Sequence, residues 1–151
     1  MLKLPTFMEL ADAGFMVCSL VFRASNPTVE QLFETYQATR DFVPEVVVAV
    51  GGGSILDVGK SLCCLYGTDL PDADSLRRLI EEKSYGHPAA RWIGVPTTAG
   101  TGSEVTCWAT IWDPERDAKR SVECRENYAF AALVDPELAA GMPVTLAVSS
   151  A

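Results

Sequence analysis

The stretch that decides the fold of this chain is Val46-Val47-Val48-Ala49-Val50-Gly51-Gly52-Gly53-Ser54-Ile55-Leu56-Asp57-Val58-Gly59-Lys60. It predicts a strand, a glycine turn and a helix. The five apolar residues at its start do not alternate with polar ones, which is typical of a parallel strand buried on both faces. After the glycines, apolar residues recur at helical spacing from Ile55 onward.

The glycine turn is a candidate phosphate-binding site. Glycine has no Cβ atom, so a ligand can approach its backbone closely. Ser54 and Asp57 have the spacing of a capping box, and the N–H groups at a helix start suit an anion. The turn matches neither the dinucleotide fingerprint G-x-G-x-x-G nor the P-loop. A tight strand-to-helix turn without a ligand is therefore the alternative interpretation.

A second stretch favours the ligand. Residues 96–106 read Pro96-Thr97-Thr98-Ala99-Gly100-Thr101-Gly102-Ser103-Glu104-Val105-Thr106. They follow the short apolar run at 92–95, so they also begin where a predicted strand ends. Hydroxyl groups and backbone amides in such a loop can surround phosphates and the polar edge of a ring. We refer to residues 97–106 as the Thr-rich loop.

The two stretches, GGGSxxDxxK and PTTAGTGSEVT, together resemble the group III, iron-dependent alcohol dehydrogenases, whose superfamily also holds dehydroquinate synthase and glycerol dehydrogenase. Residues 26–28 and 134–138 match that family in order and spacing. The resemblance implies hydride transfer between NAD or NADP and a small alcohol or aldehyde substrate, with Fe²⁺ or another divalent metal as Lewis acid. Residues 109–113 and 119–121 are similar to the phosphonoacetaldehyde reductase branch.

The resemblance assigns ten residues to cofactor binding. Gly52, Gly53 and Ser54 would bind the pyrophosphate, and Asn26 would lie near the adenosine half. The remaining assigned residues are Asp57, Thr97, Thr98, Thr101, Thr106 and Lys119.

Several of these residues also have a purely structural interpretation. Asp57 could complete the capping box, Asn26 could be a helix N-cap, and Thr106 could lie on a strand face.

Lys60 is a helix-surface lysine by pattern alone, and the resemblance gives a structural or site-facing role comparable weight. We expect Trp108 and Trp112, which share one strand face, to pack.

The resemblance gives this chain no metal ligand and no catalytic residue. In the family, one Asp and three His of a helical C-terminal domain hold the metal, and the first two follow the region of Pro143 in a D-A-L-x-H-A-x-E type segment. Residues 143–151 do not contain that segment, and the lone histidine, His87, is expected in a solvated loop. The resemblance thus implies an NAD(P)-binding N-terminal domain over residues 1–151, trimmed at both ends and inactive by itself. A nucleotide-binding module without catalysis and a relative of glycerol dehydrogenase or dehydroquinate synthase remain the alternatives.

The amino-acid composition argues against several classes of binding partner. The formal charge of −8 argues against nucleic acid, and no apolar run approaches the roughly 20 residues that span a bilayer. The five cysteines include no CxxC pair, which favours reduced thiols in a cytoplasmic protein. The trimmed domain should expose apolar surface. Such a surface favours self-association, for example as a homodimer.

The overall pattern predicts an α/β fold, a Rossmann-like parallel sheet with flanking helices and a β-hairpin. We expect strands at 15–22, 46–50, 91–95 and 129–134, and a hairpin from 107–112 and 119–123. Helices are expected from Asn26, from Ser54 to about Tyr66, and after a cap at Asp74.

Overall fold

The computed structural model describes residues 5–150. A parallel sheet of order β1-β2-β5 is built from β1 (Val46–Gly51), β2 (Arg91–Pro96) and the short β5 (Ala131–Ala132). An antiparallel hairpin is built from β3 (Trp108–Asp113) and β4 (Ala118–Glu123), with the 3₁₀ turn η2 (Pro114–Arg116) at its tip. The predicted α/β class, with parallel sheet, flanking helices and hairpin, is confirmed.

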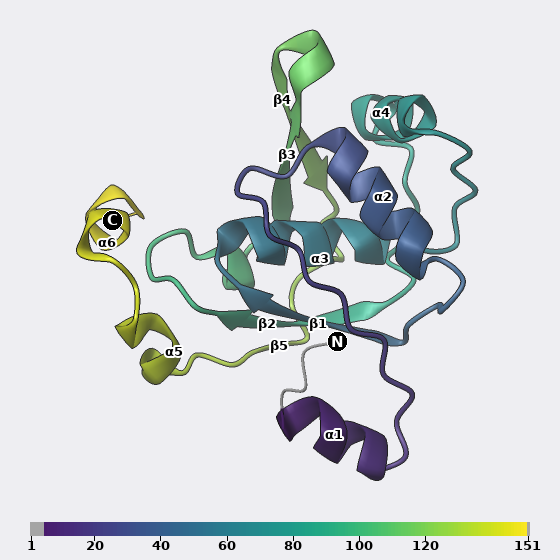
Figure 1. The fold of residues 1–151 in the computed structure, drawn as a ribbon. Coiled ribbons are helices and arrows are strands. Elements are labelled where there is room, and N and C mark those ends of the chain that lie inside the picture. The colour runs from purple at the N-terminus through teal and green to yellow at the C-terminus, as the bar shows by residue number, and fades with distance from the viewer. Residues whose placement is uncertain (1–4, 151) are drawn as a thin grey trace.

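The long helices pack on one face of the sheet. Figure 1 shows α3 (Gly53–Leu65) between the sheet and α2 (Val29–Thr39), with the hairpin rising beside α4 (Ala73–Glu82). Gly59 allows α3 to approach closely, because a Cβ atom there would lie 2.8 Å from the Cβ of Ala49. Leu56 and Leu62 of α3, Leu32 of α2 and Trp92 of β2 belong to one buried cluster.

The remaining helices lie outside this core. α1 (Pro5–Asp12) is on the other side of the sheet, while α5 (Pro136–Ala140) and α6 (Val144–Ser150) extend away from it near the C-terminus (Figure 1). The short 3₁₀ helix η1 (Ser103–Val105) lies within the Thr-rich loop. Within residues 5–150, no helix combines the length and apolar character needed to cross a bilayer.

Two expectations about the strands are wrong. β1 is not buried on both faces, because the side chains of Val46, Val48 and Val50 are 44–46% exposed on the side away from α3. Residues 15–22 form no strand, since no strand among the described residues pairs with them. Apolar composition predicts a strand, but a strand exists only where a neighbour supplies hydrogen bonds.

Three predicted helix caps are also corrected. Thr28, not Asn26, caps α2 and forms a capping box with Gln31. The N-cap of α3 is Gly52 and no side chain caps that helix, so Ser54 and Asp57 do not form a capping box. The cap of α4 is Asp72, whose side chain accepts a hydrogen bond from the backbone N–H of Ser75.

Candidate functional site

The glycine turn and the Thr-rich loop are in contact. β1 and β2 run parallel with Gly51 opposite Pro96, so both turns leave the sheet at the same edge. The N–H of Thr97 donates a 2.9 Å hydrogen bond to the carbonyl of Gly51 and thereby extends the strand pairing into the loops. The prediction that the two loops lie at one edge of the sheet is confirmed, and this edge is where ligands bind in open α/β folds.

The two glycines after β1 lie directly against threonines. A Cβ atom built on Gly52 would come within 3.3 Å of Thr98 Oγ1, and one on Gly53 within 2.9 Å of Thr101 Oγ1. No side chain caps α3 above them. Because the first N–H groups of an α-helix lack intrahelical partners, this surface combines backbone donors, hydroxyl groups and the positive end of a helix dipole. Such a surface suits an anion.

Asn26 and Ser54 are brought together at this helix start. The backbone N–H of Asn26 donates a 3.2 Å hydrogen bond to Ser54 Oγ. Asn26 has a φ of 54°, a left-handed conformation in which asparagine is enriched, instead of the extended backbone expected of an N-cap. The segment before α2 thus lies beside the glycine turn.

Asp57 faces inward instead of toward solvent. Its Oδ1 accepts a 2.6 Å hydrogen bond from Ser103 Oγ, and its Oδ2 accepts a 3.0 Å hydrogen bond from the backbone N–H of Thr110. Its Oδ1 also lies 3.3 Å from Lys60 Nζ. Both oxygens are therefore occupied in joining α3 to η1 and β3. Direct contact between Asp57 and a cofactor stays a prediction.

Lys60 is buried, so its interpretation as a helix-surface lysine is wrong. Its Nζ donates to the carbonyls of Ser103 at 2.9 Å, Trp108 at 2.5 Å and Thr106 at 3.3 Å, and to Thr106 Oγ1 at 3.2 Å. Burial lowers the pKa of Lys60 below its ordinary 10.5, although the nearby Asp57 carboxylate acts in the opposite direction. Its position three residues after Asp57, on one helix face, is the sequence signal that links the two.

The threonines of the loop divide into two groups. Thr98 and Thr101 face the glycine turn, whereas Thr106 is turned inward to Lys60. Thr101 is exposed, and its Oγ1 accepts a 3.4 Å hydrogen bond from the N–H of Ser103. Thr106 therefore supports the loop through its contact with Lys60. The contacts predicted between the other threonines and a cofactor stay predictions.

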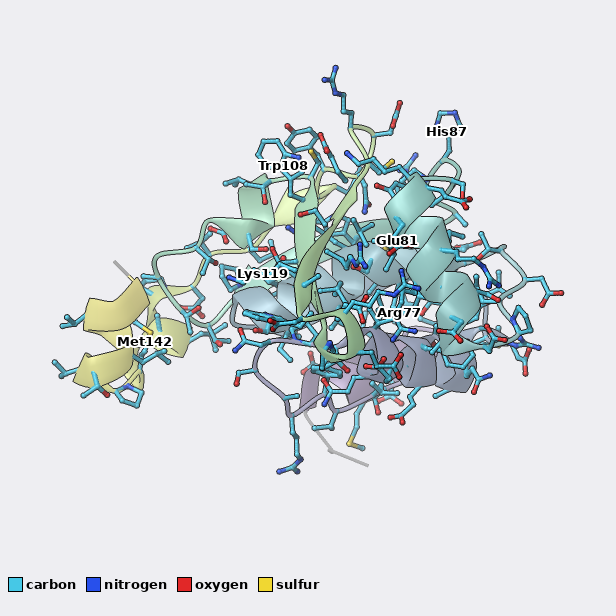
Figure 2. All side chains as sticks on the ribbon, turned by 90° about the horizontal axis from the view of Figure 1, so that it is seen from above. Arg77, Glu81, His87, Trp108, Lys119 and Met142 are labelled. Carbon is cyan, nitrogen blue, oxygen red and sulfur yellow. The ribbon has the colours of Figure 1, made fainter. Side chains whose placement is uncertain are left out.

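Lys119 lies on the exposed side of the hairpin. Its Nζ lies 4.5 Å from the centre of the Trp112 ring, on the opposite side of the hairpin from Arg77 and Glu81 (Figure 2). The N–H of Trp112 donates a 2.8 Å hydrogen bond to the carbonyl of Pro27, which brings this part of the hairpin next to the segment that contacts Ser54. Trp108 on the same face is 54% exposed, so the expectation that it packs is wrong.

A buried ion network, which sequence reasoning missed, anchors the hairpin. Asp113 is fully buried and accepts hydrogen bonds from Arg77 Nε at 3.0 Å and from Arg120 Nη2 at 3.1 Å. Burial by itself would raise the pKa of Asp113, but the two arginines lower that pKa below its ordinary value. Arg77 also pairs with Glu30 of α2. The network therefore fixes the hairpin, and Lys119 with it, against α2 and α4.

No metal centre is found within residues 5–150, where no three His, Cys, Asp or Glu side chains are grouped to hold an ion. Two surface hollows, of about 530 and 350 Å³, are lined by residues outside the glycine turn and the Thr-rich loop. The first lies between residues 20–24 and α2, and the second is lined by residues 83, 85–87 and 123–126, His87 among them. A cleft of cofactor size at the two loops stays a prediction.

Comparison with known proteins gives concordant results. The family model described as iron-containing alcohol dehydrogenase matches residues 5–136. Phosphonoacetaldehyde reductase of Streptomyces viridochromogenes is 40% identical over 101 residues, which are 65% of this chain and 26% of that protein. NADPH-dependent butanol dehydrogenase of Clostridium saccharobutylicum is 29% identical over 137 residues, covering 91% of this chain and 35% of that protein.

Solved structures agree in fold. Sulfoacetaldehyde reductase from Bifidobacterium kashiwanohense, in complex with NAD⁺, is similar with a TM-score of 0.80 and 32% identity, over 96% of this chain and 38% of that chain. The chain thus spans between about a quarter and two-fifths of the length of these relatives.

Proposed function

The chain belongs to the iron-containing alcohol dehydrogenase family, and from this premise we propose that residues 1–151 bind NAD or NADP for hydride transfer to or from a small aldehyde or alcohol. Because the chain covers only part of each relative's length, the activity of those whole proteins is itself part of the proposal. The role proposed for this stretch is that of the NAD(P)-binding N-terminal domain.

The proposal rests mainly on the close contact between the glycine turn and the Thr-rich loop. The space beside Gly52 and Gly53 is small enough that a Cβ atom would meet Thr98 or Thr101, and it lies at an uncapped helix start. Backbone N–H groups, hydroxyl groups and a helix dipole at one helix start are a donor set that suits a pyrophosphate. The residues present therefore fit a dinucleotide.

We assign the following parts to these residues. The backbone N–H groups of Gly53 and Ser54 bind the pyrophosphate, and Asn26 lies near the adenosine half. Thr97, Thr98 and Thr101 orient the nicotinamide half through their hydroxyl groups. Lys119 adds a positive charge from the hairpin. The cofactor, when bound, supplies or accepts the hydride.

Iron does not fit the described residues. Because residues 5–150 offer no group of three ligating side chains, no step is derived through a metal. The same observation favours a second candidate function, in which this stretch, taken by itself, binds the nucleotide without turnover.

For the substrate we propose a small aldehyde that carries an anionic group. The support is that two of the relatives are named as reductases of phosphonoacetaldehyde and sulfoacetaldehyde. We further propose a cytoplasmic protein that acts on small molecules and binds neither nucleic acid nor membrane. The free thiols of its five cysteines and its formal charge of −8 support this.

The test is a fluorescence titration of the purified chain with NADH and with NADPH. We expect saturable binding of at least one of them, with energy transfer from tryptophan to the nicotinamide. If neither nucleotide binds to the folded chain, the proposed function is wrong.

A further inference from the structure

We infer that the buried ammonium group of Lys60 is the positioning group that holds the Thr-rich loop in the shape the cofactor site requires. The part of this inference that concerns the cofactor rests on the proposed function. The part that concerns the loop does not, because it predicts loop order in the cofactor-free chain.

Lys60 Nζ is surrounded by backbone oxygen atoms, as a bound cation is, whereas the Nζ of a surface lysine is surrounded by water. Three backbone carbonyls, those of Ser103, Thr106 and Trp108, point at one Nζ atom from a segment more than forty residues away. An ammonium group has three N–H donors and no acceptor, so its charged form can donate to one more carbonyl than the neutral amine can. Asp57 adds the matching negative charge at 3.3 Å.

The loop is thereby fixed at both ends. Its start is tied to β1 by the hydrogen bond from Thr97 to Gly51, and its second half is tied to α3 by Lys60 and by the hydrogen bond from Ser103 to Asp57. Thr101, which lies against Gly53, stands between these two anchors. Without Lys60 the carbonyls of Thr106 and Trp108 lose this donor, and the hydrogen bond from Ser103 to Asp57 is left to hold the second half of the loop. Thr101 would then be less firmly held beside the glycine turn.

Few charged or titratable groups lie close enough to Lys60 to replace its positive charge when it loses a proton. The charged or titratable groups that face it are Asp57 on its own helix, Glu104 in η1 and Cys107 before β3, while β2 contributes the Trp92 ring at 5.5 Å. A neutral amine donates one hydrogen bond fewer and loses the attraction to Asp57. Since burial lowers the pKa of Lys60, this loss begins at a lower pH than for an exposed lysine.

The first experiment measures amide hydrogen exchange of the cofactor-free chain. Lys60→Met keeps the length of the side chain and removes its charge, and Lys83→Met is the matched control because the exposed Lys83 pairs with Glu123, outside residues 97–106. We expect peptides covering residues 97–106 to exchange on the order of tenfold faster in Lys60→Met and at the wild-type rate in Lys83→Met. Unchanged exchange in a folded Lys60→Met protein would overturn the inference.

The wild-type chain provides a test that does not depend on the variant folding. As pH rises from neutrality toward 10.5, the ordinary pKa of lysine, protection of residues 97–106, corrected for intrinsic exchange, should fall while protection of α3 persists. Parallel behaviour of the loop and α3 over this range would contradict the inference.

The second experiment measures NADH affinity over the same pH range. Affinity should decline on the alkaline side in the wild type and in Lys83→Met, and should be weaker and less dependent on pH in Lys60→Met. An alkaline decline as large in Lys60→Met as in the wild type would overturn the cofactor part of the inference. If no variant binds NADH at any pH, the proposed function fails, and hydrogen exchange still decides whether Lys60 orders the loop.

Discussion

The hydroxyl of Ser103 donates a 2.6 Å hydrogen bond to Oδ1 of Asp57 and so joins the Thr-rich loop to helix α3. Ser103 is buried, and the same carboxylate holds the backbone of β3 through its other oxygen. One side chain of α3 therefore fixes two segments that follow it by about fifty residues. These two hydrogen bonds make the loop part of the packed structure.

Ser103→Ala tests this connection. The substitution leaves Asp57 Oδ1 with Lys60 as its remaining partner, and a hydrogen bond to a charged group contributes about 1.5–3 kcal/mol. We expect the free energy of unfolding in urea to fall by about that amount. The exposed Ser84 offers the control, since Ser84→Ala should change it by less than about 0.5 kcal/mol. Equal effects of the two substitutions would contradict the role given to Ser103.

Thr101→Val should weaken the cofactor without unfolding the chain. The side chain is exposed, so its replacement costs little stability, whereas one hydroxyl contact contributes about 0.5–1.5 kcal/mol of binding. We expect the Kd for NADH, measured by fluorescence titration, to rise several-fold. A Kd that does not change would remove Thr101 from the site.

Arg77→Met tests the network that anchors the hairpin. Arg77 is buried with Asp113, and removing one partner of a buried ion pair costs about 3–5 kcal/mol. We expect the free energy of unfolding to decrease by an amount in that range. The next residue on the same helix, Arg78, is exposed, and Arg78→Met should leave the stability within about 0.5 kcal/mol of the wild type. A similar loss in both variants would show that the buried pairing is not the cause.

The lowered pKa of Asp113 predicts how this network responds to acid. A carboxyl whose pKa is lower in the folded state than in the unfolded state stabilises the fold above its ordinary pKa, here 3.8, and loses that contribution as pH falls toward its folded-state pKa. The difference in free energy of unfolding between wild type and Asp113→Asn should therefore be constant near neutral pH and shrink below about pH 4. Denaturant titrations over the acid range measure it, and a difference that grows on acidification would contradict this account.

The sequence predicted the parts of this structure that depend on local pattern. The apolar run at 46–50 and the glycines after it predicted β1, the turn and α3, and the turn residues at 113–117 predicted the hairpin. Two parallel strands place their following loops at one edge of a sheet, so the position of the glycine turn beside the Thr-rich loop followed from topology.

The missed features depend on contacts between distant residues. Nothing local to Lys60 indicates that carbonyls from 103, 106 and 108 surround it, and nothing local to Arg77 indicates Asp113. Asp57 matched a capping box by spacing, but its oxygens found stronger partners in Ser103 and Thr110. The apolar residues 15–22 suit a strand but lack a neighbour to pair with among the described residues.

The proposed function requires that the turn after β1 binds the pyrophosphate of a nicotinamide dinucleotide. Comparing the NADH affinity of Gly53→Val with that of Gly86→Val tests this requirement. A Cβ atom on Gly53 would lie 2.9 Å from Thr101 Oγ1, so the valine displaces that side chain and covers the helix start, whereas nothing lies within 4 Å of a Cβ atom on Gly86. We expect Gly53→Val to abolish binding while circular dichroism shows that the chain remains folded, and we expect Gly86→Val to bind like the wild type. A folded Gly53→Val chain with wild-type affinity would contradict the claim.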